Sequence, residues 1–544
     1  MLVCSVFLRY DYRRESFFLR RKMKKKRFAS CLTAVLLILA LCFAGCKTNN
    51  GGGFKTDVVV VGGGMAGVSA ALAAAQNGAG VILVEKQASI GGASAQGGGG
   101  LGAAGSAVQR EHGIVDTPRD WLDMYYMRAN QTKAPYRNMS FPVEQDVKWL
   151  INESVNIIDW LLEQGMTFGR PFGIAMDLAE RYHSISNKGY ISGAGVVKFL
   201  SEKAKDLGVD IRVQTKAVKV LQESGPGSRA IGIELEDGSR IYAGAVILAA
   251  GGFMSDIGKY LPGVEVVPWN ESLSTFLLGE GIEMAVEAGG ALWEDPWASG
   301  VDPTQGLTVD GLPEVERINE GIWVDSSGAR IGFEGGNSGV QANYPIFAQK
   351  DGGKLFAIIS DSHAVPTQEQ LAGGRVFKGS SIAELAANAG INPDKLAREI
   401  AAYNAISDAI AVLNNSSAPD EAYRGVDPLD IEGANTNPNK QAAMYGITRK
   451  TYRKIEGDAF YAVELLPHVC LTFGGVKTKT GTSEVLDKND PARVIPGLYA
   501  AGENANRNFY DKVYMSGSAT MQAIATGRAA GRAAAAYTNY RQAL

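Results

Sequence analysis

The stretch that decides the fold begins with Asp57–Val61, which reads DVVVV, and continues with Gly62–Gly67, which reads GGGMAG. The nearly continuous apolar run is typical of a strand buried on both faces of a parallel sheet. An alanine-rich segment through Gln76 then predicts a helix, and Val81–Val84 predicts a second strand that ends at Glu85. Strand, glycine-rich turn, helix and strand together predict one βαβ unit of an α/β fold.

Each glycine of the turn has a separate task in such a unit. Gly62 permits the tight turn, Gly64 lets the backbone approach a pyrophosphate, and Gly67 lets the helix pack closely on the sheet. The free N–H groups and the positive dipole end of the helix then face the phosphates. Glu85 follows at the distance where a carboxylate accepts hydrogen bonds from ribose hydroxyls. The sequence therefore predicts a dinucleotide site, because a purely structural glycine turn would not need this acid.

Length and composition limit the other possibilities. The chain has 544 residues and 46% hydrophobic content, which is ample for a large core and more than one domain. Its 66 glycines gather in runs such as Gly97–Gly100 and not in a fixed repeat, which excludes a collagen-like chain. The formal net charge of −3 argues against nucleic acid as a partner. The sequence has 4 scattered histidines and no Cys-x-x-Cys-His motif, which argues against metal and haem sites.

The N-terminal segment has the features of an export signal. Residues 13–27 are strongly basic, Cys31–Ala44 is a short apolar run, and small residues precede Cys46. The apolar run is too short for a comfortable membrane span. Leu41–Cys46, which reads LCFAGC, resembles a bacterial lipoprotein signal with Cys46 as the acylated residue, and two or more acyl chains would give stable anchoring. We expect an extracytoplasmic protein anchored to the bacterial cell membrane; an uncleaved anchor helix and a start at Met23 stay open.

Two later clusters repeat the pattern of an apolar strand followed by glycines. The first is Ala245–Gly252, and the second runs through Ile495–Glu503. Between them the composition changes, with more loops, several tryptophans and a helical stretch at about 383–413. This order predicts a substrate domain inserted into the dinucleotide domain, which is then formed by both ends of the chain.

The chain resembles the flavoprotein subunits of the fumarate reductase family, the soluble flavocytochrome type in particular, over nearly its whole mature length. The residues that carry the resemblance are Gly62–Gly67, Glu85-Lys86, Gly91–Ser94, Gly97-Gly98, Ala250–Gly252 and Gly497–Glu503. The resemblance implies FAD as the cofactor, held in a Rossmann-like FAD-binding domain, with an inserted α+β capping domain that holds the substrate beside the flavin. The FAD-binding residues that it implies are Gly62, Gly64, Met65, Ala66, Gly67, Glu85, Lys86, Gly92, Ala93, Ser94, Gly97, Gly98, Ala217, Ala250, Gly251, Gly252, Gly502, Glu503, Ser518 and Ala519.

The resemblance also implies domain boundaries and a reaction. Residues 1–46 would be the signal peptide and 47–54 a tether, 55–296 and 471–540 the two parts of the FAD-binding domain, and 297–470 the capping domain. In this family a hydride passes from flavin N5 to one carbon of a C=C bond. A protein acid then protonates the neighbouring carbon.

Four positions depart from the fumarate-type pocket, which relies on two histidines and two arginines. Asp302 stands for a histidine, and His363 lies beside the place of one arginine. Cys470, expected to be a small apolar filler, lies in the stretch of the second histidine, and Tyr514 stands for the last arginine. A dicarboxylate needs bidentate arginine contacts, each worth roughly 1.5–3 kcal/mol. We therefore expect a substrate that is neutral or carries one carboxylate, and not fumarate.

Four residues are candidates for catalysis. Tyr514 resembles the tyrosine near the end of 3-ketosteroid dehydrogenases, whose phenol polarises a ketone; packing on the flavin edge is the alternative. His363 could replace the lost acid because it titrates near neutrality, unless it is an ordinary packed histidine. Glu334 keeps the glutamate of the family's proton relay, whose later arginine is absent, and a salt-bridged glutamate is the alternative. Asp302 either takes part in the reaction or caps its loop.

These features favour a reductase for an activated C=C bond in an enone or a mono-acid. The reverse reaction, dehydrogenation beside a ketone as in the ketosteroid enzymes, stays open. An alternative of another class is a lipoprotein that keeps FAD for electron transfer or ligand binding without turnover, because the family's histidines and arginines are missing. A reductase would need an external electron donor and a dehydrogenase an acceptor, since the sequence shows neither a haem motif nor an obvious covalent-FMN segment.

Overall fold

The described part of the chain forms one compact unit within Phe54–Leu544. The computed structural model describes residues 56–129, 142–174, 177–268, 275–299, 321–331, 344–414, 453–512, 514–515 and 517–543. The predicted signal peptide with Cys46, the tether, Asp302 and Glu334 lie outside these ranges. None of the described helices is long and apolar enough to cross a membrane.

The main sheet combines strands from both ends of the chain. Its strand order is β18-β19-β9-β1-β2-β6, and β8 of the β7–β8 hairpin also pairs with β9. The pairs from β19 through β9, β1 and β2 to β6 are parallel, and β18 and the hairpin are antiparallel. The bounds are β1 Thr56–Val61, β2 Val81–Val84, β6 Asp210–Arg212, β7 Ala217–Gln222, β8 Ala230–Leu235, β9 Arg240–Leu248, β18 Glu484–Leu486 and β19 Val494–Ala500. The predicted α/β fold with a βαβ unit at the first strand is confirmed.

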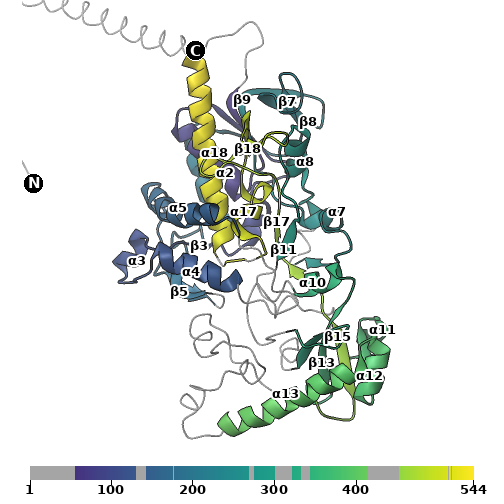
Figure 1. Ribbon diagram of the computed structural model, residues 1–544. Helices are drawn as coiled ribbons and strands as arrows, with labels where there is room; N and C mark the ends of the chain where they lie inside the picture. Colours follow the sequence, from purple (N-terminus) through teal and green to yellow (C-terminus); the bar gives the residue numbers. More distant parts are fainter. Residues whose placement is uncertain are drawn as a thin grey trace, which may run out of the picture. The chain divides into compact units, whose positions relative to one another are not determined.

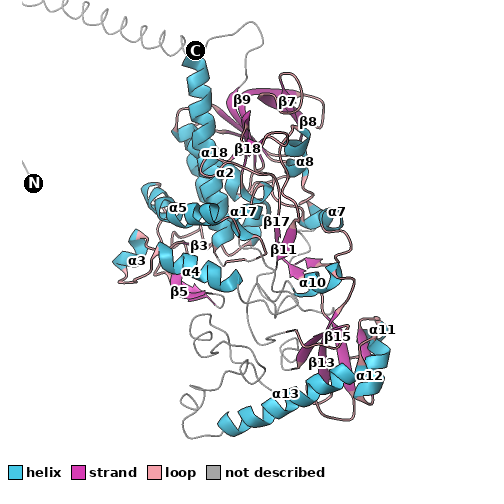
Figure 2. Ribbon diagram, viewed as in Figure 1, coloured by secondary structure: helices cyan, strands magenta, loops and turns pink. Residues whose placement is uncertain are grey.

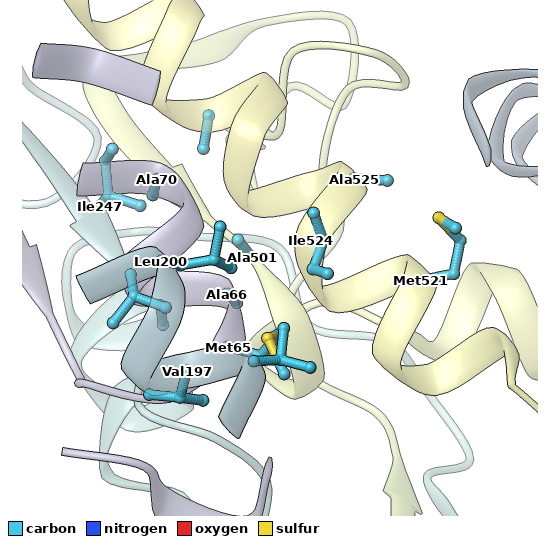
Figure 3. Close-up of a cluster of buried hydrophobic side chains, with 14 of the residues drawn as sticks. Met65, Ala66, Ala70, Val197, Leu200, Ile247, Ala501, Met521, Ile524 and Ala525 are labelled. Atoms are coloured by element: carbon cyan, nitrogen blue, oxygen red, sulfur yellow. The ribbon is translucent and has the colours of Figure 1, made fainter. Parts of the chain in front are cut away.

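Helix α2 (Met65–Gln76) follows β1 through the glycine turn and packs against the C-terminal helix α18 (Ser518–Ala543). Figure 1 shows the two helices side by side, and Figure 3 shows apolar side chains of both helices in one buried cluster with side chains from other elements. A Cβ atom at Gly527 would overlap the carbonyl oxygen of Ala66, and Gly531 has the same relation to the next turn of α2. These glycines therefore let two helix backbones approach closely.

Further helices and a small sheet surround this pair. Helix α6 (Ser192–Asp206) packs on α2, and α5 (Glu144–Glu163) packs on α18. The small antiparallel sheet has the order β3-β5-β4. Its strands and the helices near it are β3 Leu101–Gly102, β4 Phe172–Ile174, β5 Asp177–His183, α3 Ala107–Glu111 and α4 Pro118–Ala129.

A second antiparallel sheet, β12-β13-β15-β14, falls inside the range predicted for the capping domain. Its strands are β12 Ile322–Asp325, β13 Leu355–Ser360, β14 Val376–Gly379 and β15 Phe460–Glu464, with helices α10 Tyr344–Lys350, α11 Gln368–Ala372, α12 Ile382–Ala389 and α13 Pro393–Asn414. Figure 2 shows α12 and α13 lying against this sheet, where they occupy the helical stretch expected from the sequence. Buried apolar side chains pack on both of its faces. The domain boundaries themselves stay a prediction.

Short elements complete the described structure. The strand β11 pairs antiparallel with β17, and β10 pairs parallel with β16. The bounds of these and the remaining elements are β10 Val267–Pro268, β11 Trp297–Ser299, β16 His468–Val469, β17 Leu471–Phe473, α7 Ile257–Tyr260, α8 Glu280–Glu287, α17 Arg507–Tyr510, η1 Gly92–Gln96, η2 Met254–Asp256 and η6 Gly502–Asn504.

Candidate functional site

A cavity of about 720 Å³ opens at the carboxyl ends of the parallel strands β1, β2, β9 and β19. Each of the four strand ends contributes to its lining, through Val61, Val84, Ala249 and Gly502 respectively. In open α/β sheets, ligands bind in the crevice outside these strand ends. The volume also lies in the range of about 300–1,000 Å³ that is usual for cofactor and small-molecule sites.

The turn between β1 and α2 has the geometry that a bound pyrophosphate requires. Gly62 has a φ of +106°, and a Cβ atom there would overlap the carbonyl oxygen of Ala249. At Gly64, by contrast, a Cβ atom would meet nothing closer than the Ser94 hydroxyl at 3.7 Å, so this backbone is open to the cavity. Gly64 caps α2 without a side-chain hydrogen bond, and the first turn carries no acidic residue. The helix N-terminus therefore favours an anion.

One end of the cavity carries charged groups. The buried carboxylate of Glu85 accepts hydrogen bonds from the backbone N–H groups of Gly63 (2.7 Å) and Gln87 (2.8 Å). Lys86 forms an ion pair with Glu280, whose carboxylate also lies 3.5 Å from the ammonium of Lys216. Ala217 lines the cavity next to this group. Glu85 and the N-terminus of α2 thus border the same part of the cavity, which suits the ribose and phosphates of a dinucleotide, and we call it the adenosine end.

A half-buried acid, Glu503, also lines the cavity. Thr472 donates a hydrogen bond to the Glu503 carboxylate at 2.8 Å. Burial raises the pKa of Glu503 to about 7, although the hydrogen bond from Thr472 opposes the rise. A Cβ atom at Gly252 would overlap both of these side chains. Gly252 therefore makes room for the Glu503–Thr472 pair.

The far end of the cavity is aromatic. Tyr514 and Tyr510 line it with ring centroids 6.1 Å apart, and Tyr510 stacks on Phe473 at 4.7 Å. Burial raises the pKa of Tyr514 well above its usual value, and the nearby Cys470 and Tyr182 raise it further. The Tyr514 phenol therefore stays protonated at physiological pH and can donate a hydrogen bond. This end is suited to a flavin ring and a substrate with few charges.

Most of the predicted cofactor residues gather along this one cavity. Those that line it are Gly62, Gly64, Met65, Ala66, Glu85, Lys86, Gly92, Ala93, Ser94, Gly97, Gly98, Ala217, Ala250, Gly251, Gly502, Glu503 and Ala519. Gly67, Gly252 and Ser518 do not line it. A Cβ atom at Gly67 would overlap the carbonyl oxygen of Gly62, so Gly67 serves the packing of the turn.

The predicted catalytic residues do not all come together. Tyr514 lines the cavity, whereas Asp302 and Glu334 lie outside the described residues. His363 is buried just after β13, and it is not among the residues that line the cavity. Its Nδ1 lies 3.1 Å from the Ser360 hydroxyl, and its Nε2 lies 3.3 Å from the carbonyl oxygen of Arg453. These contacts hold His363 within its own part of the chain, and its role as the replacement acid stays a prediction.

Several lining residues were missed by the sequence reasoning. Phe172 and Tyr182 come from the β4–β5 pair, and Glu280 comes from α8. Tyr510 lies four positions before Tyr514, and this tyrosine pair was the one local signal that could have revealed it. The other three reach the cavity through long-range packing.

Comparisons with known proteins agree with this geometry. Residues 57–521 match the family described as "FAD binding domain". A relative named "Fumarate reductase (cytochrome)" from Shewanella frigidimarina is 30% identical over 462 residues, which cover 80% of this chain and 70% of the relative. A relative named "NADH:acrylate oxidoreductase" from Vibrio harveyi is 25% identical over 415 residues, which cover 71% of this chain but 36% of that protein.

A solved structure shows the same fold. It is a 3-ketosteroid-Δ4-(5α)-dehydrogenase from Rhodococcus jostii RHA1 in complex with 4-androstene-3,17-dione. The match has a TM-score of 0.63 and 23% sequence identity, and it covers 90% of this chain and 99% of that one.

Proposed function

We propose, from the premise that the chain belongs to the FAD binding domain family and is an FAD-dependent oxidoreductase, a more specific activity. It acts on an activated C=C bond in a neutral or mono-acid substrate. Bound FAD supplies hydride transfer at N5 to or from one carbon of that bond. The observation that carries the proposal is Tyr514, a buried and protonated phenol at the flavin end of the cavity. Family membership also confirms the resemblance and the FAD cofactor that were inferred from the sequence.

The charges around the cavity support a substrate with at most one carboxylate. Among the residues that the structure describes, no arginine lines the cavity. The two lysines that line it, Lys86 and Lys216, lie at the adenosine end near Glu280. A second carboxylate would lose charge-assisted contacts of roughly 1.5–3 kcal/mol each. The relative named for acrylate, a mono-acid, is consistent with this substrate class.

Tyr514 would act on the carbonyl group that activates the double bond. When a hydride reaches the carbon β to that carbonyl, negative charge develops on the carbonyl oxygen. A phenol O–H that points at this oxygen stabilises the charge, and its buried setting strengthens the hydrogen bond. The same contact makes the C–H bonds beside a ketone more acidic, so Tyr514 also favours the reverse reaction, dehydrogenation next to a ketone, as a second candidate.

The test uses the protein with FAD bound and reduced by dithionite without oxygen. A panel of enones, mono-acid enoates and fumarate is then mixed with it, and flavin absorbance is followed. We expect fast reoxidation by a neutral or mono-acid compound and none by fumarate. Rapid reoxidation by fumarate would contradict the proposed substrate class. Reduction of the oxidised protein by saturated ketones, with no reaction on the enone side, would instead favour the dehydrogenase direction.

We further propose that the enzyme works outside the cytoplasmic membrane, anchored through a lipid on Cys46. The support is the sequence of the leader, a basic region and a short apolar run before LCFAGC. An external electron donor for the reductase, or an acceptor for the dehydrogenase, completes the reaction.

A further inference from the structure

Two aromatic side chains of the small sheet line the cavity near its aromatic end. Phe172 on β4 and Tyr182 on β5 are directly paired across the strands. Their ring centroids are 5.1 Å apart, with an angle of 59° between the planes. Phe172 is 43% exposed although it lines the cavity, so the pair presents ring surface that the protein does not cover.

The Tyr182 side chain packs closely against the backbone of three glycines. A Cβ atom at Gly98 would come 3.2 Å from the Tyr182 hydroxyl, and one at Gly100 would overlap the ring. A Cβ atom at Gly517 would come 3.2 Å from the Cδ2 atom of the ring. Gly517 belongs to the turn that carries Tyr514, so Tyr182 lies beside the phenol proposed to contact the substrate.

The strand that carries Tyr182 is anchored from its other face. Successive side chains of a strand point to opposite faces, so Arg181 and His183 point away from Tyr182. Arg181 forms a buried ion pair with Asp116, with Nη2 and Oδ1 2.7 Å apart. His183 Nε2 lies 2.7 Å from the hydroxyl of Ser106. A ring held on a strand anchored in this way loses little conformational freedom when a ligand stacks on it.

We propose that Phe172 and Tyr182, together the aromatic wall, stack on an aryl ring of the substrate, so that the preferred substrates are enones or mono-acid enoates conjugated to an aromatic ring. This inference rests on the proposed function and names its substrate class more closely. Aromatic rings attract one another in offset or edge arrangements with centroids about 4.5–7 Å apart. The described charged residues that line the cavity have partners of their own: Lys86 and Lys216 lie near Glu280, Glu85 accepts backbone hydrogen bonds, and Glu503 accepts one from Thr472. An uncharged ring is therefore the partner that suits this wall.

The test measures binding and not turnover. The oxidised protein with FAD bound is titrated with two pairs of saturated probes, and the change in flavin absorbance gives each Kd. The first pair is benzylacetone and its cyclohexyl counterpart, and the second is hydrocinnamate and cyclohexylpropanoate. Hydrophobic burial alone predicts tighter binding of the cyclohexyl member, because the saturated ring is the more apolar one. Stacking predicts the opposite order.

We expect the aryl member of at least one pair to bind about 3- to 10-fold tighter. The Phe172→Leu variant keeps an apolar side chain at an exposed position, and it should bring the two members of that pair within about twofold. Tyr182→Phe keeps the ring and the preference. Tyr540→Leu, an exposed aromatic on α18 outside the cavity, is the matched control and should change nothing.

Three results would overturn the aromatic wall: equal or reversed affinities in both pairs, no binding of any probe, or a preference that survives Phe172→Leu. The proposed function fails separately. If the aryl probes bind as expected but no unsaturated compound reoxidises the reduced flavin, stacking on the aromatic wall is supported and the reductase activity is contradicted. If enones with an aryl or a cyclohexyl ring reoxidise the flavin equally well, the reductase activity is supported and the preference for an aryl ring is contradicted.

Discussion

Without FAD, the wild-type protein is expected to lose stability as the pH rises, because Glu503 must ionise in the folded state. The Glu503→Gln substitution should remove this loss. In the folded chain, burial raises the pKa of Glu503 from 4.5 to about 7. The folded state therefore holds this proton more tightly than the unfolded state does. The associated stability is fully present below the unfolded pKa of about 4.5, and it is lost as the pH rises through about 7.

The magnitude follows from the difference between the two pKa values. Each pKa unit corresponds to about 1.4 kcal/mol, so the ceiling is about 3 kcal/mol at pH 8. The carboxylate borders the cavity, where water solvates its charged form, so we expect about half of this value. Glutamine has nearly the same shape, and its amide oxygen can still accept the hydrogen bond from Thr472.

The assay compares urea unfolding of the two proteins, both without FAD, at pH 5 and at pH 8. Other titrating groups cancel in the difference between variant and wild type. We expect Glu503→Gln to match wild type within about 0.5 kcal/mol at pH 5 and to be more stable by about 1.5 kcal/mol at pH 8. A difference in unfolding free energy that stays the same at both pH values would refute the reasoning.

Three further predictions concern the cofactor, the reaction and the anchor. Tyr514→Phe should lower kcat about 100-fold in stopped-flow turnover while FAD absorbance stays unchanged, because one donor to the developing negative charge is lost; an unchanged kcat would assign Tyr514 to packing. Gly67→Ala should abolish FAD retention on gel filtration, because the new methyl group would overlap the carbonyl oxygen of Gly62, whereas Gly169→Ala, where nothing lies within 4 Å, is the control that keeps FAD. Cys46→Ser should move the protein from the membrane fraction to the soluble fraction on immunoblots, and a variant that stays in the membrane fraction would contradict lipid anchoring.

The adenosine and phosphate part of the site could be predicted because its information is local. Asp57–Val61, the glycine turn and Glu85 lie within one short segment, and each step depends on the backbone of its neighbours. The apolar strands before Gly251 and Gly502 could be found by the same rule. The resulting residues surround one cavity because the ends of parallel strands meet at one edge of a sheet.

The flavin end could not be predicted in the same way. Phe172 and Tyr182 reach it only because β4 and β5 pair and β5 packs beside the Gly97–Gly100 run, which no local pattern reveals. His363 shows the opposite limit. Its place beside the family's arginine suggested an acid, but it is not among the residues that line the described cavity, and its ring nitrogens lie near Ser360 and the backbone of Arg453. The direction of a side chain is not written in the sequence, and the role of His363 as an acid stays a prediction.

The packing of α18 on α2 has a consequence for how the protein matures. The helix α18 follows α2 in the sequence only after the whole intervening chain, yet α2 needs α18 to cover its apolar side chains. The apolar face of α2 therefore stays exposed while the intervening chain is synthesised. The cavity at the first strand ends can therefore bind FAD tightly only after α18 has been made and has packed on α2.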